Sequence, residues 1–258
     1  MNLPQIKKEW KLIKPYNPLS SHTFNEKDRY SNVHAKSSTR VHLNKIRSEI
    51  ESGEYKIRSE IESRDGYINA NHVSYEGFEF ITTQAPLPHT IGDFWEMIIT
   101  HDITTIVMLT DFMEKGVKKA DKYWSDTPLV INGVTVKLVE EKLETNLVVR
   151  KFNIDGRLIN HFQYLDWKDH QSPASINSIN KLIDRIDGKI VVHCSAGIGR
   201  TGTFIGCMLV KKLRTNKIYD IVKKLREDRD GMVQTFNQYK FIYKYLEKII
   251  LDDIPSLE

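Results

Sequence analysis

The organisation of the whole chain follows from one segment, KIVVHCSAGIGRTGTF at residues 189–204. Ile190 to Val192 form a short β-branched run, which predicts a buried strand. From Thr201 onward the apolar residues recur at helical spacing, so we expect a helix that ends near Arg214. The loop between strand and helix, Cys194–Arg200, contains two glycines and is expected to be tight.

This order of strand, loop and helix predicts an anion-binding loop. Its amides and the unpaired N–H groups of the helix start can point at one ligand, and the glycines let the backbone approach that ligand closely. Cys194, at the base of the loop, is expected to ionise readily, and the fork of Arg200 suits two phosphate oxygens. A nucleophile, an oxyanion receptor and a clamp in one loop indicate phosphoryl transfer to sulfur.

The stretch resembles the active-site loop of the protein tyrosine phosphatases. The resemblance implies an α+β fold, with one phosphatase domain over residues 1–258 that is family-like from about 24 to 251. It also implies a twisted mixed sheet flanked by helices, with the phosphate-binding loop between strand and helix. By the same match Cys194 is the nucleophile, Arg200 binds the phosphate, Thr201 helps Cys194 leave, and His193 is structural, hydrogen-bonded behind Cys194 and tuning its ionisation. The residues whose amides line the loop are Ser195, Ala196, Gly197, Ile198 and Gly199.

A second matching segment, KDRYSNV at residues 27–33, implies how the substrate is bound. Tyr30 holds the place of the family tyrosine that stacks on the substrate ring, and Asn32 that of the residue that contacts the substrate backbone. A deep cleft lined by a tyrosine admits phosphotyrosine and excludes the shorter phosphoserine. The alternative is that Tyr30 is an ordinary half-buried aromatic residue. Asp28 departs from the family's asparagine and is expected to loosen the local packing.

Three further segments complete the match. Glu114 fits the acid that holds the phosphate-binding arginine, and Lys119 fits a lysine near the substrate. The family's mobile Trp-Pro-Asp loop corresponds to residues 167–169, so Asp169 is the implied general acid, with His170 as a weaker alternative. Lys168 replaces the proline, which should make this loop less restricted and, if its ammonium points inward, lower the pKa of Asp169. Near the carboxyl end, Gln234 is implied to position the hydrolytic water, and Gln238 lies nearby.

Composition limits the possible partners and the environment of the chain. The 258 residues are 40% hydrophobic and carry a formal net charge of +4, which suits an anionic substrate but is too small to indicate a nucleic acid. The two cysteines predict no disulfide framework, and Cys207 is expected in the core. We find no signal peptide or spanning apolar run, so we expect a cytoplasmic protein without membrane insertion. We also expect a monomer, and neither a cofactor nor a metal, because the phosphate clamp already supplies positive charge.

Two segments stand outside the family pattern. KIRSEIES at residues 45–52 recurs at 56–63, an 11-residue tandem duplication that could form a partner-binding helix or, as we favour, a neutral surface insertion. Residues 10–24 contain Pro15 and Pro18, which predict an irregular lead-in rather than a long helix.

The sequence thus predicts a protein-tyrosine phosphatase that acts on phosphotyrosine-containing proteins through a phosphocysteine intermediate. One alternative is a phosphotyrosine-binding pseudophosphatase with weak or no turnover because of Lys168, and another is a phosphatase of broader specificity. The relaxed motifs and the duplication also resemble the tyrosine phosphatases carried by polydnaviruses of parasitoid wasps. That resemblance implies host signalling or adhesion phosphoproteins as substrates and the host cytoplasm as the location.

Overall fold

A mixed β-sheet runs through the centre of the computed structural model, which describes residues 2–13, 25–43, 66–167, 173 and 175–252. Among these residues, nine strands form this sheet in the order β1-β2-β3-β11-β4-β10-β9-β8-β7, and β5 pairs with β6 in a separate ribbon. The strands are β1 Arg40–His42, β2 Tyr67–Tyr75, β3 Phe78–Thr83, β4 Thr105–Met108, β5 Met113–Glu114, β6 Val117–Lys118, β7 Leu129–Ile131, β8 Val134–Leu143, β9 Leu147–Ile154, β10 Arg157–Tyr164 and β11 Ile190–His193.

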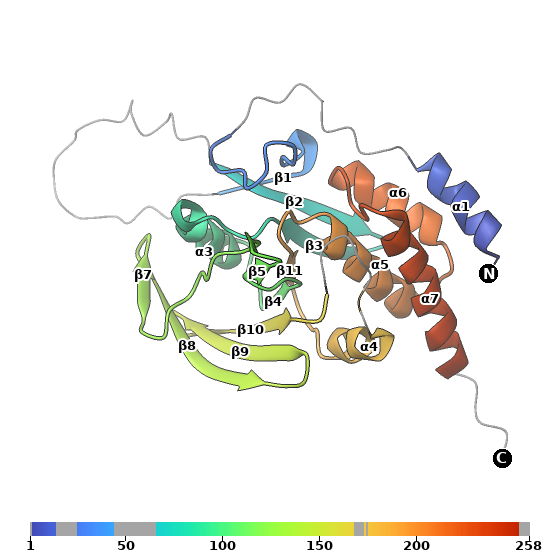
Figure 1. Cartoon of the computed structure of the whole chain (residues 1–258). Coiled ribbons are helices and arrows are strands. Elements are labelled where there is room, and N and C mark those ends of the chain that lie inside the picture. Colours follow the sequence, from blue (N-terminus) through green and yellow to red (C-terminus); the bar gives the residue numbers. More distant parts are fainter. Residues whose placement is uncertain (1, 14–24, 44–65, 168–172, 174, 253–258) are drawn as a thin grey trace, which may run out of the picture.

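Helices cover both faces of the sheet (Figure 1). Their bounds are α1 Leu3–Leu12, α3 Ile91–Thr100, α4 Ile176–Asp184, α5 Gly199–Leu213, α6 Ile218–Asp228 and α7 Phe236–Asp252, and the short 3-10 helices are η1 Ser37–Thr39 and η2 Pro88–Thr90. The α+β fold that the sequence predicts is therefore confirmed, including the strand and the helix on either side of the loop at Cys194.

The central strand β11 is buried over its whole length because it lies between two apolar clusters. It runs parallel to β3 on one side and to β4 on the other, and β10 extends this parallel core beyond β4. Alternate side chains point to opposite faces: Ile190 and Val192 join the cluster under α4–α7, whereas Val191 joins the cluster under α3. The carboxyl end of β11, where the loop begins, is thus held from both faces.

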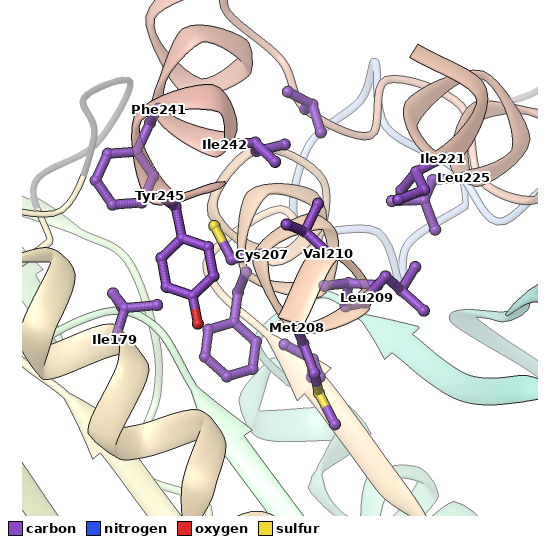
Figure 2. Close-up of a cluster of buried hydrophobic side chains, with 14 of the residues drawn as sticks. Ile179, Cys207, Met208, Leu209, Val210, Ile221, Leu225, Phe241, Ile242 and Tyr245 are labelled. Carbon is purple, nitrogen blue, oxygen red and sulfur yellow. The ribbon is translucent and has the colours of Figure 1, made fainter. Parts of the chain in front are cut away.

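Helix α5 lies inside the larger of these clusters, and Figure 2 shows the side chains around it. The labelled residues are Cys207, Met208, Leu209 and Val210 on α5, Ile221 and Leu225 on α6, Phe241, Ile242 and Tyr245 on α7, and Ile179 on α4. Cys207 is fully buried, as the sequence predicts, and both cysteines are free thiols. Since helix α5 is fixed on three sides, the position of its first residues is fixed as well.

The amino-terminal segment corrects one prediction. Residues 10–12, expected to be irregular, are the last residues of helix α1, which starts with Pro4 in its first turn, where a proline is well tolerated. Ile6 and Ile13 are buried, so the helix is stabilised by packing rather than by its own propensity. Pro15 and Pro18, and the duplication at 45–63, lie outside the described residues.

Candidate active site

The loop that follows β11 is buried and closely packed. Cys194 is 3% exposed, Ile198 is fully buried, and helix α5 begins at Gly199. Gly197 adopts φ +73°, and a Cβ atom there would lie 2.2 Å from the carbonyl oxygen of Thr83 at the end of β3. Only glycine satisfies both conditions, so this contact fixes how closely the loop lies against the sheet.

Arg229, which directly follows α6, fixes the middle of this loop. Its guanidinium is fully buried and donates to the carbonyl oxygens of Gly197 (2.9 Å) and Ala196 (3.1 Å). It also donates to the side-chain oxygens of Asn71 and Asn69 on β2, each at 2.7 Å. Because these bonds draw the loop carbonyls toward Arg229, the loop amides are left to face an anionic ligand. Sequence reasoning missed Arg229, since a single arginine at the end of a helix carries no local signal.

A neutral network holds the first residue of the loop from behind. The carbonyl oxygen of Cys194 accepts from Nδ1 of His193 (3.0 Å), so Nε2 of His193 accepts from the hydroxyl of Tyr123 (2.9 Å). The Tyr123 hydroxyl in turn accepts from Nε2 of His161 at 2.7 Å, which leaves Nδ1 of His161 facing the Arg150 guanidinium (3.5 Å). The structure therefore places His193 behind Cys194, where the resemblance implies it.

Burial keeps all three members of this network uncharged. It lowers the pKa of His193 to about 4 and, with the Arg150 charge nearby, lowers the pKa of His161 well below its ordinary value. The pKa of Tyr123 is raised well above its ordinary value, again by burial. The network therefore supplies fixed geometry but no formal charge near Cys194 at neutral pH.

Arg200 and Glu114 form an ion pair at the start of α5. Nη1 of Arg200, 1% exposed, lies 2.5 Å from Oε1 of Glu114, which also accepts from the hydroxyl of Thr110. The same Arg200 nitrogen donates to the carbonyl oxygen of Trp167 at 2.8 Å. The structure thus brings Glu114 to Arg200 and connects Arg200 to the residue that precedes the predicted acid segment. Lys168, Asp169 and His170 lie outside the described residues.

Tyr30 contacts the loop directly. The hydroxyl of Ser195 donates to the carbonyl oxygen of Lys119 (2.6 Å), and the Tyr30 hydroxyl lies 2.8 Å from the same Ser195 oxygen. Tyr30 and Lys119 are half-buried, and Asn32 is exposed. Arg29 holds this segment through its bonds to the carbonyl oxygens of Ala85 (3.0 Å) and Pro86 (2.7 Å) and to Asp121 (2.8 Å).

The expectation that Asp28 loosens its surroundings is wrong. Asp28 is 5% exposed and accepts from Tyr67 (2.5 Å), Asn69 (2.7 Å) and His34 (2.6 Å). Since Asn69 also binds Arg229, Asp28 belongs to the polar framework that supports the loop.

Gln234, Gln238 and Thr201 gather at the first turn of α5. A Cβ atom on Gly199 would lie 3.1 Å from Oε1 of Gln234 and 3.0 Å from Nε2 of Gln238, so both amide side chains lie against the start of the helix. Gln238 is 1% exposed, and its Oε1 accepts from the backbone N–H of Gln234 at 2.9 Å. The hydroxyl of Thr201 is buried and has no hydrogen-bond partner among the residues that the structure describes.

Over the described part of the chain, no three histidine, cysteine or carboxylate side chains converge where they could hold a metal ion. No helix found there is both long and apolar enough to cross a membrane.

Comparison with known proteins agrees with this arrangement. A family model described as "Protein-tyrosine phosphatase" matches residues 24–248. The mouse tyrosine-protein phosphatase non-receptor type 7 is 36% identical over 239 residues, which are 85% of this chain and 63% of the mouse protein. The human tyrosine-protein phosphatase non-receptor type 20 is 34% identical over 248 residues, 87% of this chain and 54% of that protein. The chain thus spans between one half and two thirds of the length of these relatives.

Solved structures show the same fold. A structure of PTPN18 in complex with HER2-pY1248 phosphopeptides superimposes with a TM-score of 0.76 and 28% sequence identity, over 87% of each chain. A second PTPN18 structure, described by its fingerprint on distinct HER2 tyrosine phosphorylation sites, gives a TM-score of 0.75 over 87% of this chain and 83% of that one.

Proposed function

The chain belongs to the protein-tyrosine phosphatase family, and on this basis we propose that it hydrolyses phosphotyrosine in proteins through a cysteinyl-phosphate intermediate. The observation that carries the proposal is the loop at Cys194, whose carbonyls are bound by Arg229 and His193 while Arg200 stands at the start of α5. This leaves the amides of Ser195, Ala196, Gly197, Ile198 and Gly199 to bind the phosphate.

In the first step, the Cys194 thiolate attacks phosphorus and forms an S–P bond while the bond to the phenolic oxygen breaks. The loop amides and the Arg200 guanidinium stabilise the charge on the equatorial oxygens. Asp169 donates its proton to the departing phenolate. The contact of Arg200 with the Trp167 carbonyl supports this role, because it links the phosphate site to the residue two positions before Asp169.

In the second step, water attacks the phosphocysteine, and inorganic phosphate and the free thiol side chain are released. Gln234 positions the water, Asp169 takes its proton, and the Thr201 hydroxyl donates to the departing thiolate. The buried and unpartnered Thr201 hydroxyl supports this role, since it is free to bond to sulfur. The side chains of Gln234 and Gln238 at Gly199 support the position of the water.

The substrates we propose are phosphotyrosine-containing proteins. Tyr30, joined to Ser195 at the edge of the loop, would stack on the substrate ring, with Asn32 on the substrate backbone and Lys119 near the substrate and the general-acid loop. PTPN18 was solved with phosphotyrosine peptides, which supports the same substrate class here. A monomer in the cytoplasm stays our prediction, and the viral origin with host phosphoproteins as substrates stays a prediction of the sequence resemblance alone.

The test is phosphate release from a phosphotyrosyl peptide and from its phosphoseryl twin, with Cys194→Ser as the control. Turnover of the phosphotyrosyl peptide alone, lost in the control, supports the proposal. Equal turnover of both peptides would indicate the broader phosphatase. Tight peptide binding by both proteins without any turnover would establish the pseudophosphatase, for which Lys168→Pro is the variant expected to restore turnover if the missing proline is the cause.

A further inference from the structure

Helix α1 lies before the residues that the phosphatase family model matches, which begin at residue 24. It nevertheless packs on the catalytic domain, beside α7 (Figure 1). The Trp10 ring lies 5.3 Å from that of Tyr239 and 6.3 Å from that of Phe236, measured between centroids. The Glu9 carboxylate accepts from the hydroxyls of Tyr239 (3.0 Å) and Tyr243. These contacts join α1 to the first turns of α7, directly after Gln234.

Arg226 connects α1 to the segment before Gln234. Its guanidinium lies over the Trp10 ring, 5.1 Å from the centroid, and donates to the carbonyl oxygens of Met232 (2.8 Å) and Val233 (2.7 Å). Burial lowers the pKa of Arg226 to about 10, so the group remains charged at neutral pH. A partly desolvated cation is attracted more strongly to an indole ring than an exposed one. Trp10 therefore restrains the Arg226 guanidinium, which binds the carbonyl oxygens of Met232 and Val233.

The peptide group between Val233 and Gln234 is held at both of its polar atoms. Arg226 binds its carbonyl oxygen, and Oε1 of Gln238 binds its N–H at 2.9 Å. Val233 itself adopts φ +58°, a conformation that β-branched residues rarely take, and its own N–H donates to the carbonyl oxygen of Ile198 at 3.2 Å. Because the turn is intrinsically unfavourable, it depends on these external bonds to keep its shape.

We infer that Trp10 and Arg226 are positioning residues for Gln234, so that helix α1 sets the rate at which water hydrolyses the phosphocysteine. This inference rests on the proposed function. The first step should depend on α1 much less, since Arg229 and His193 hold the loop at three carbonyls, those of Gly197, Ala196 and Cys194, whereas the turn at Val233 holds it at the Ile198 carbonyl alone. The second step should depend on it, because a small displacement of the water lowers the rate strongly.

The experiment is stopped-flow kinetics of the full chain with p-nitrophenyl phosphate, which separates formation of the phosphocysteine from its hydrolysis. In Trp10→Ala we expect the hydrolysis rate to fall about fivefold while the formation rate stays close to that of the wild type, so that the burst of p-nitrophenol grows and kcat/KM is largely retained. Arg226→Lys, which keeps the charge but cannot bridge both carbonyls, should behave in the same way. Trp10→Phe, which keeps a ring under the guanidinium, should recover most of the hydrolysis rate.

Leu12→Ala is the matched control, because Leu12 lies on the same helix and is 64% exposed. It should leave both rates unchanged. A Trp10→Ala protein with a lower melting temperature but wild-type rates for both steps would overturn the inference and leave α1 a purely structural helix. Equal losses in both steps would overturn it as well. A wild-type chain that releases no p-nitrophenol in any step would instead refute the proposed function, and the inference would fall with it.

Discussion

Two buried polar networks hold the phosphate-binding loop, one at its first residue and one at its middle, and they differ in charge. Behind Cys194, the chain His193–Tyr123–His161 is neutral. At Ala196 and Gly197, the holding group is the permanent cation Arg229, surrounded by four oxygen acceptors. From this difference we expect positive charge at the loop to come from Arg229 and Arg200, whereas the neutral His193 contributes position.

Removing the cation should have the largest effect. In Arg229→Met four buried oxygens lose their donor, so we expect the free energy of unfolding to fall by about 4 kcal/mol and kcat/KM to fall about 100-fold. Urea unfolding and steady-state assays of the phosphotyrosyl peptide measure the two effects. Arg229→Lys is the control for charge alone, and it should recover little, because an ammonium cannot reach all four acceptors. A Met variant as stable and active as the wild type would show that Arg229 does not hold the loop.

Acid should weaken the neutral network, because its histidines are held uncharged by burial. Because the pKa of His193 is about 4 in the folded protein and about 6.5 unfolded, only the unfolded chain takes up the proton as the pH falls from 7 to 5. Stability should be complete above pH 6.5 and decrease below it, by about 2 kcal/mol at pH 5 for His193, with His161 adding to the loss.

Urea unfolding at pH 7 and pH 5 measures this loss. Carboxylates contribute to the same pH range, so the informative quantity is the difference between the wild type and His161→Gln, whose stability should depend less on pH. An identical slope in both proteins would show that His161 is not held neutral.

Tyr123→Phe should have a smaller effect. It removes one hydroxyl that serves Nε2 of both histidines, and we expect a loss of about 1.5 kcal/mol in the free energy of unfolding. Cys194 should also become less well positioned, so we expect a moderate decrease in kcat/KM in the steady-state assay of the phosphotyrosyl peptide. No change in stability would mean that the two histidines find other partners.

The smallest expected effect is the coupling energy between one substitution in each network, which tests whether the two networks are separate. They share no hydrogen-bond partner in the described structure, so Tyr123→Phe and Arg229→Lys should have additive effects on the free energy of unfolding, within about 0.5 kcal/mol. The double variant, measured by urea unfolding beside both single variants, closes the cycle. A larger coupling energy would mean that the loop transmits strain from one network to the other, and the two would have to be treated as one.

Residue patterns alone predicted the parts of the site that are local in the chain, whereas the pairing of Glu114 with Arg200, 86 residues apart, was expected only from the family resemblance. The strand, the loop and the helix around Cys194 follow from an apolar run, two glycines and helical spacing, and the structure has them at β11 and α5. The framework behind the loop was missed because its contacts join distant positions: Arg229 binds Asn71, 158 residues away, and Tyr123 binds His193, 70 residues away. Helix α1 was missed because its stability comes from packing on α7, which ten residues of sequence do not reveal.

The two thiols of the chain stand thirteen positions apart and are both buried, yet their surroundings differ. Cys207 is completely enclosed by the helices around α5, and burial raises its pKa well above the ordinary value, so it offers an electrophile neither an approach nor a thiolate. Cys194 begins the loop that we propose to bind the phosphate of the substrate. The folded protein should therefore accept a single equivalent of an alkylating label, at one known atom, and would serve as its own site-selective scaffold for attaching a fluorophore or an affinity tag without any cysteine having to be replaced.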